Sequence, residues 1–254
     1  MTTLLYDSTF EGLMTAVFEV FEYKYDVVEI VAQQNYSQEN FFAETHEVIT
    51  DFNKSDRVLK KLEENLGKQG ISQLMMVYFS ERKDLERLIL SAVRHSIKHP
   101  KQNILQDFGN DDILEISKIC RSVSRERHRM LAFVRFELLQ DEVYFAKIEP
   151  DFNVLPLIRK HFKERYADQK WMIFDLKRHY GIFYDLKEVQ FFTPDSSQLQ
   201  NFRNSEQFHH EEEKKYQKLW QRYFVKTGIP ERKNMKLHIQ WVPKRYWKYL
   251  TEKY

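Results

Sequence analysis

The sequence predicts an α+β protein, because the spacing of its apolar residues changes along the chain. Over most of residues 1–130 the apolar residues recur at three- and four-residue steps, as in helices that pack one face on a core. From Leu131 to Phe192 short runs rich in β-branched and aromatic residues flank one further helical segment. We therefore expect an antiparallel sheet with the order β-β-α-β-β, packed with a largely helical N-terminal part and C-terminal helices.

The N-terminal half begins with a short strand at Thr3–Tyr6. Ser8 and Glu11 have the spacing of a capping box, so a helix is expected to start near Thr9. Thr45–Thr50 alternates as a strand does, and a helix follows it until Gly67 or Gly70. The expected helices of this half cover residues 54–66, 71–79, 84–97 and 111–129.

The sheet is predicted from two β-rich runs, at residues 131–136 and 143–148, that a turn at 139–142 joins. Asn153 is a candidate cap for a helix over 154–166. The remaining strands are expected at residues 171–175, 181–185 and 188–192.

The C-terminal part is expected to form a long polar helix over residues 206–225 and a short helix near 245–252. Trp241 and Trp247 are interpreted as a plug that packs the last helix on the core. Lys244 and Arg245 stay undecided between packing and phosphate binding.

With 254 residues, 42% of them hydrophobic and 15% aromatic, the chain can bury a sizeable core. We expect one compact domain over 1–254, with a soft subdivision into 1–125, 126–192 and 193–254. No apolar run approaches the roughly 20 residues that a membrane-spanning helix needs. These observations favour a cytoplasmic protein without a membrane partner.

Several classes of site are excluded by composition. The six glycines do not form a GxGxxG or P-loop motif, and the single cysteine excludes an internal disulfide and multi-cysteine metal sites. No HExxH or GxSxG motif occurs. We therefore expect no cofactor and no metal.

Charge is unevenly distributed along the chain. Residues 1–50 carry a net charge of −8 and residues 201–254 one of +7. A basic segment of this kind can attract phosphates, or it can pair with an acidic part of the same protein.

Cations and one histidine around the predicted sheet are candidates for nucleic-acid binding. Guanidinium groups bind phosphate through paired hydrogen bonds, and nearby aromatic rings accept unstacked bases. The alternative is that these side chains belong to an exposed helix end and a solvated helix face. The candidates are Arg125, Arg129, Arg135, His161, Arg165 and Arg178.

Three residues are weak candidates for acid–base chemistry, namely Glu126, His128 and Asp175. Glu126 and His128 are two positions apart, so a helix would turn them in different directions. A lyase or glycosylase that acts on a damaged base would require all three side chains to converge in one pocket.

Several segments resemble a bacterial family described as probable DNA metabolism or repair proteins, which includes a domain of unknown function. The resemblance covers nearly the whole chain. It rests on Tyr6–Leu13, Arg125–Phe136, Ile148–Pro156, Asp175–Gly181, Glu231–Asn234 and Pro243–Trp247.

The resemblance implies a partner, because members of that family look like companions of a radical S-adenosylmethionine protein of DNA repair or modification. A similar domain also occurs fused to uracil-DNA glycosylase-like domains. Two departures stand out: Ser8 replaces an expected glycine, and Phe152 replaces an expected histidine. A histidine that is absent at position 152 cannot be required for chemistry in this protein.

We therefore expect a DNA-associated accessory protein that binds nucleic acid through a basic surface and acts with such a partner. Two alternatives stay open at this point: a lyase- or glycosylase-like repair enzyme, and a protein-interaction module, which would expose an apolar patch.

Overall fold

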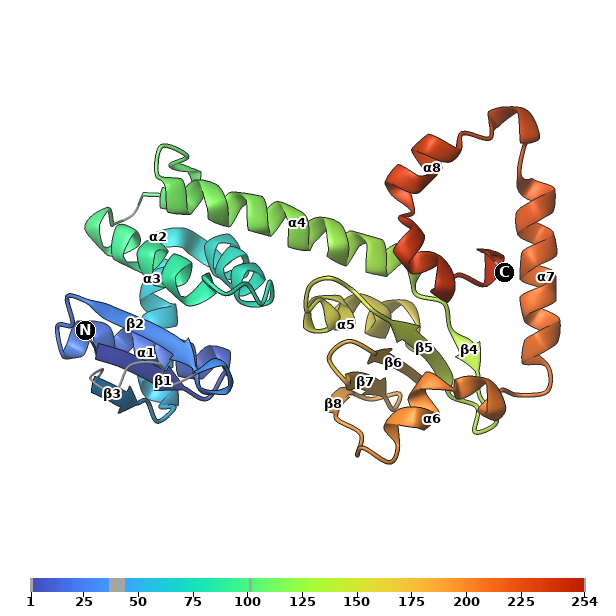
Figure 1. The fold of residues 1–254 in the computed structure, drawn as a ribbon, viewed down its shortest axis with the longest axis horizontal. Coiled ribbons are helices and arrows are strands. Elements are labelled where there is room, and N and C mark those ends of the chain that lie inside the picture. Colours follow the sequence, from blue (N-terminus) through green and yellow to red (C-terminus); the bar gives the residue numbers. More distant parts are fainter. Residues whose placement is uncertain (1, 37–43, 101, 254) are drawn as a thin grey trace. The chain divides into compact units, whose positions relative to one another are not determined.

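The protein is described from a computed structural model, which covers residues 2–36, 44–100 and 102–253. The chain divides into two compact units, residues 1–124 and 125–254 (Figure 1). The division falls within one long helix, α4 (Asp111–Phe133), which contributes to both units. In the described part of the chain, no helix is both long and apolar enough to span a membrane.

The first unit contains a three-stranded sheet in the order β2-β1-β3, and all of its strands are parallel. Its strands are short, and α1 makes the connection from β1 to β2 that parallel pairing requires. The elements are β1 (Thr2–Tyr6), α1 (Phe10–Glu22), β2 (Val28–Ala32), the 3₁₀ turn η1 (Gln33–Asn35) and β3 (Glu44–Glu47).

The start of α1 differs from the expected capping box. Thr9, not Ser8, is the N-cap, because its side chain accepts a hydrogen bond from the backbone N–H of Gly12 at 2.9 Å. Ser8 has a φ of 65°, a left-handed conformation that glycine adopts more readily. A glycine would therefore be less strained at this position.

Helices complete the first unit. They are α2 (Phe52–Tyr78), α3 (Leu85–Lys98), the 3₁₀ turn η2 (Ile104–Gln106) and the first half of α4. The two helices predicted over 54–66 and 71–79 form one element with a kink at Gly67, whose φ of 68° is not helical. The predicted break at this glycine is thus confirmed.

The second unit contains a five-stranded sheet in the order β4-β5-β6-β7-β8. Its elements are β4 (Glu137–Leu138), β5 (Tyr144–Ile148), α5 (Leu155–Arg165), β6 (Trp171–Asp175), β7 (Tyr180–Tyr184) and β8 (Val189–Phe192). The predicted α+β class is confirmed, but the sheet is not purely antiparallel. Strands β5 and β6 are parallel, because α5 carries the chain back to the starting end of β5.

The strand predicted at residues 131–136 is wrong. Helix α4 continues to Phe133, and only the two-residue strand β4 follows. The apolar residues of this run pack at helical spacing: Met130 is buried, and the Phe133 ring lies 5.6 Å from the ring of Tyr246. Tertiary packing therefore overrides the local β propensity.

The C-terminal part wraps the second unit with short helices. These are α6 (Leu199–Arg203), η3 (Ser205–Phe208), α7 (Glu213–Thr227), η4 (Pro230–Arg232), α8 (Met235–Trp241), η5 (Lys244–Tyr249) and η6 (Thr251–Lys253). Tyr246 and Leu250 are buried, whereas Trp241 is 66% exposed. The expectation that Trp241 packs as a plug is wrong, and Tyr246 takes that place.

Candidate functional site

The loop of residues 149–153, which we call the Asp151 loop, gathers segments that are far apart in the sequence. The backbone N–H of Asp151 donates to Glu126 at 2.9 Å, and its carbonyl accepts from Lys177 and Arg178 at 3.0 and 3.1 Å. The Asp151 carboxylate pairs with Arg245 at 2.7 Å. Segments that carry the family resemblance thus meet on one loop.

Glu126 holds this loop from within the unit. Its side chain is 2% exposed and accepts hydrogen bonds from Arg245 at 2.9 Å and from the Tyr246 hydroxyl at 2.5 Å. Burial, together with the hydrogen bond to Glu126, raises the pKa of Tyr246. The buried carboxylate therefore has hydrogen-bond donors within the protein in place of water.

Asp175 holds the same loop through Arg178. The Asp175 carboxylate is fully buried and accepts from the Arg178 guanidinium at 2.9 Å, and Arg178 also donates to the carbonyl of Pro150 at 3.1 Å. Burial raises the pKa of Asp175, although Arg178 opposes the shift. Arg178 was predicted to contact nucleic acid, but its side chain is only 9% exposed and holds the loop instead.

The three catalytic candidates do not lie together. Glu126 and Asp175 both contact the region of the Asp151 loop, but each is enclosed by its own arginine. His128 lies on an exposed face of α4, away from the buried Glu126. The convergence that a lyase or glycosylase would need is absent for these residues.

Arg135, a predicted phosphate ligand, is also engaged internally. Its guanidinium binds both carboxylate oxygens of Glu252, at 2.7 and 3.2 Å, and donates to the carbonyl of Ala132 at the end of α4. Glu252 also accepts from the Trp220 indole at 3.0 Å. Although burial raises the pKa of Glu252, the bonds from Arg135 and Trp220 outweigh it and lower the pKa. The arginine thus anchors α7 to α4.

The remaining predicted cations are more accessible. Arg125 is exposed on α4, and Arg165 is exposed with its guanidinium 5.7 Å from the Tyr166 ring. Arg129 is half-buried, with its guanidinium 3.7 Å from Glu126. His161 is half-buried, edge-on to the Phe162 ring at 5.4 Å. Arg125 and Arg165 are therefore the members of the predicted set that stay available to a partner.

Helix α7 is exposed along almost its whole length. Among its residues only Glu213 is buried, where it accepts the backbone N–H of Leu138 at 2.8 Å. Four cations occur at three- and four-residue steps and share one face, which we call the outward face of α7. They are Lys215, Lys218, Arg222 and Lys226, and all are exposed.

Exposed aromatic rings lie beside these cations. Tyr216 and Tyr223, seven residues apart, are 51% and 60% exposed. The rings of Tyr223 and Trp220 stack at 5.7 Å. The sequence from Lys214 to Thr227 contains no acidic residue. The arrangement offers cations to phosphates and ring faces to unstacked bases.

The sequence reasoning missed this helix as a site, although its signal was present. The sequence predicts a long polar helix over residues 206–225, but none of the predicted site residues lies on it. A helix in which aromatic residues flank a stripe of cations, with no acidic residue over fourteen positions, is that signal.

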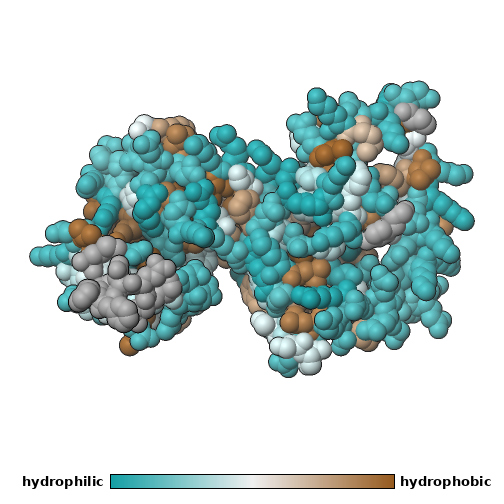
Figure 2. Space-filling view, viewed as in Figure 1, coloured by the Kyte–Doolittle hydropathy of each residue, from teal (hydrophilic) through white to brown (hydrophobic). Residues whose placement is uncertain are grey.

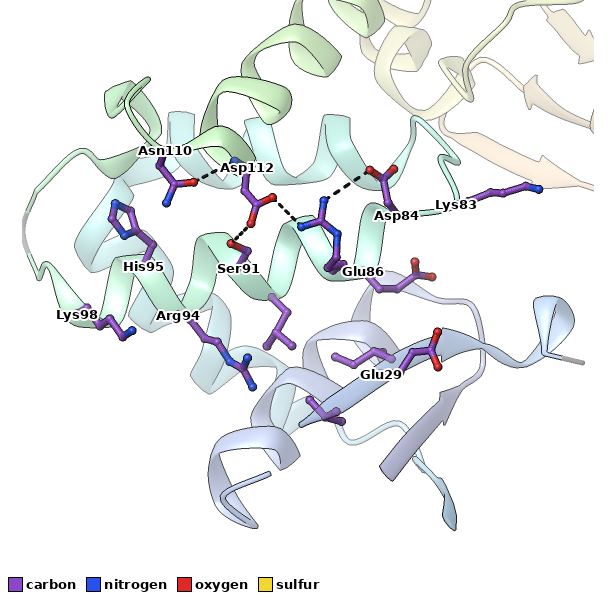
Figure 3. Close-up of a pocket in the computed structure, with 14 residues that line it drawn as sticks. Glu29, Lys83, Asp84, Glu86, Ser91, Arg94, His95, Lys98, Asn110 and Asp112 are labelled. Carbon is purple, nitrogen blue, oxygen red and sulfur yellow. Dashed lines mark hydrogen bonds and ion pairs between the residues drawn. The ribbon is translucent and has the colours of Figure 1, made fainter. Parts of the chain in front are cut away.

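The first unit has a separate polar pocket of about 650 Å³ between β2, α3 and the start of α4 (Figure 3). Asp112 lines the pocket and accepts from Ser91 and from Arg87, the latter at 2.6 Å. Arg94 donates to the carbonyl of Tyr25 at 3.3 Å. Asp112 thus joins the start of α4 to α3, and Arg94 joins α3 to the segment before β2. The polar groups of this pocket therefore stabilise the fold of the first unit.

Glu86 lies at the edge of this pocket and is buried. Its carboxyl group accepts the Tyr6 hydroxyl at 3.0 Å, and among the described residues it forms no ion pair. Burial raises the pKa of Glu86 and also that of Tyr6.

Comparison with known proteins identifies the family. No curated protein matches the chain. Residues 83–252 match the family described as a domain of unknown function, DUF4130. This range includes α3, α4 and almost all of the second unit, with the Asp151 loop and α7. Because the match extends over about two thirds of the sequence, the chain belongs to the DUF4130 family.

Proposed function

We propose that the second unit binds single-stranded nucleic acid through the outward face of α7. The observation that carries the proposal is the exposure of four aligned cations beside two tyrosines on a helix that buries only one of its own residues. Cations that track the backbone and rings that stack on bases together characterise sequence-tolerant binders of single strands.

The charge of the two units supports this choice. Residues 125–254 hold 26 Lys or Arg and 18 Asp or Glu, for a net charge of +8, whereas residues 1–124 hold 14 and 20, for −6. The basic unit therefore attracts polyanions, while the acidic unit repels them. Arg125 and Arg165 add exposed cations to the same unit.

DNA is the proposed nucleic acid, and the proposed role is that of a cytoplasmic accessory protein in DNA repair or metabolism, acting with a radical S-adenosylmethionine protein. The support is the resemblance of the motif segments to proteins of DNA metabolism, together with the basic surface. Phosphate contacts position such a protein without selecting a sequence.

The test is fluorescence anisotropy of the full chain with a labelled 20-nucleotide oligo-dT and with a duplex of equal length. Replacing the four cations of the outward face of α7 by Gln should weaken oligo-dT binding about tenfold or more. The control removes four exposed cations elsewhere on the same unit: Arg159, Lys160, Lys170 and Lys187.

The control variant has the same net charge as the α7 variant, so it separates a local interface from general attraction. We expect it to retain binding within about threefold. Equal losses in the two variants, or duplex binding as tight as oligo-dT binding, would contradict the proposal.

A further inference from the structure

A groove between the end of α7 and α8, which we call the α7–α8 groove, encloses about 850 Å³. This volume lies within the range of ligand-binding cavities. Its apolar lining is accessible to solvent: Val225, Ile229 and Leu237 are 75%, 51% and 49% exposed. Phe224, Met235 and Trp241 complete the lining and are also exposed. Hydrophobic atoms reach the surface in the region of α8 (Figure 2).

Cations surround this apolar floor. Arg232, Lys233 and Lys253 line the groove. Lys253 is held in place, since its ammonium lies 5.2 Å from the Phe224 ring and 2.8 Å from His238 Nε2. Residues 222–241 contain five Lys or Arg and a single acid, Glu231. The groove therefore combines an apolar floor with a basic rim.

We infer that the α7–α8 groove binds an amphipathic helix of a partner protein that carries acidic residues beside its apolar face. Soluble proteins rarely expose a contiguous apolar patch that has no partner. An apolar stripe with residues at i, i+3, i+4 and i+7 fills a groove of this kind, and flanking carboxylates complement the basic rim.

The lining argues against nucleic acid as the occupant. Four of its six apolar side chains, Val225, Ile229, Met235 and Leu237, are aliphatic or thioether groups, which offer no ring for a base to stack on. Of the two rings, Phe224 already has the Lys253 ammonium over its face at 5.2 Å, so Trp241 is the one ring of the apolar lining that has no cation over it among the described residues. The stacking rings Tyr216 and Tyr223 lie on α7 outside the groove lining. The docking site is thus distinct from the outward face of α7, and the inference does not depend on the proposed nucleic-acid binding.

The experiment selects binders from a display library of random 16-residue peptides against the immobilised full chain. We expect the enriched peptides to share apolar residues at helical spacing and an excess of Asp and Glu. In the variant Ile229→Ser with Leu237→Ser their affinity should fall about tenfold or more. The matched control is Leu219→Ser, since Leu219 is 50% exposed on α7 but outside the groove, and it should change the affinity less than about twofold.

Three results would overturn the inference. One is an absence of peptides that distinguish the wild type from the double variant, and another is enrichment of basic or non-amphipathic peptides. The third is a loss of oligo-dT affinity in the double variant as large as its loss of peptide affinity, which would place nucleic acid in the groove. Because both substituted residues are about half exposed, the double variant should fold, and circular dichroism checks this.

Discussion

Three buried carboxyl groups have different partners: Glu86 in the first unit, and Glu126 and Asp175 in the second. In the first unit Glu86 is buried against the Tyr6 hydroxyl, without a cation among the described residues, and its pKa is raised. In the second unit Glu126 and Asp175 are at least as deeply buried, but each accepts from an arginine. Burial raises the pKa of Asp175 as well, and Arg178 opposes that shift. Burial of a lone carboxyl favours its neutral form, whereas an arginine favours the charged form.

This difference shows what the cations of the second unit do. Three arginines bind carboxylates and carbonyls inside the unit: Arg135, Arg178 and Arg245. They therefore stabilise its fold and do not form a binding surface. Among the exposed cations of this unit, one group lies on α7 and another lines the α7–α8 groove. A high net charge alone therefore does not identify a binding surface, because the partner of each cation must be known.

The largest effect is expected from Glu126→Ala. Removal of this carboxylate leaves the buried Tyr246 hydroxyl and the Asp151 N–H without their acceptor, and Arg245 loses one of its two carboxylate partners. The free energy of unfolding should fall by about 3 kcal/mol in urea titration. As a control, Glu164→Ala removes a carboxylate that is 66% exposed and should change it by less than about 0.5 kcal/mol. Equal losses of unfolding free energy in the two variants would contradict the distinction between carboxylates that stabilise the fold and carboxylates on the surface.

The next effect concerns the aromatic rings beside the cations of α7. Tyr223→Ala should weaken oligo-dT binding by about 1 kcal/mol or more, because each stacked base is worth about 1–3 kcal/mol. Tyr23 of the first unit, 52% exposed, is the matched control, and Tyr23→Ala should leave binding unchanged. A loss in both variants would show that binding is not confined to the second unit.

A pair of Gln variants compares the two kinds of carboxyl group through pH. The raised pKa of Glu86 means that the folded state holds its proton more tightly than the unfolded state, so its contribution to stability falls as pH rises above 4.5. Glu86→Gln should therefore stabilise the protein at pH 8 relative to the wild type, by a margin that shrinks toward pH 4.5.

Glu252 has a lowered pKa, so the sign is opposite: its contribution is present above pH 4.5 and is lost as pH falls through the folded pKa. Glu252→Gln should destabilise the protein at pH 8, and the difference from the wild type should shrink under acid. Urea unfolding at several pH values measures both variants. Parallel pH profiles for the two variants would contradict the comparison.

Much of the fold could be predicted from local patterns, but the pairing of its strands could not. Trp171–Asp175 is a short continuous run of apolar and aromatic residues, so its strand type could be predicted from the sequence. Strand direction depends on where α5 returns the chain, which no local pattern contains. The strand predicted at 131–136 is wrong for a related reason, since packing against Tyr246 extends α4 to Phe133.

The site could be predicted only in part. Arg135 and Glu252 are 117 positions apart, so no sequence motif predicts the ion pair between them. Arg178 and Asp175 are three positions apart, yet their burial follows from the sheet around them. The outward face of α7, in contrast, follows from residue spacing alone once the helix is known.

The most direct test of the central claim is the salt dependence of oligo-dT binding by the full chain. Four phosphate contacts on α7 predict a slope of about −2.8 for log K against log salt concentration, because each contact to a single strand contributes about −0.7. Replacing the four cations of the outward face by Gln should bring the slope close to zero. A wild-type affinity that does not change between about 50 and 200 mM salt, or a slope that the four substitutions leave intact, would contradict the account.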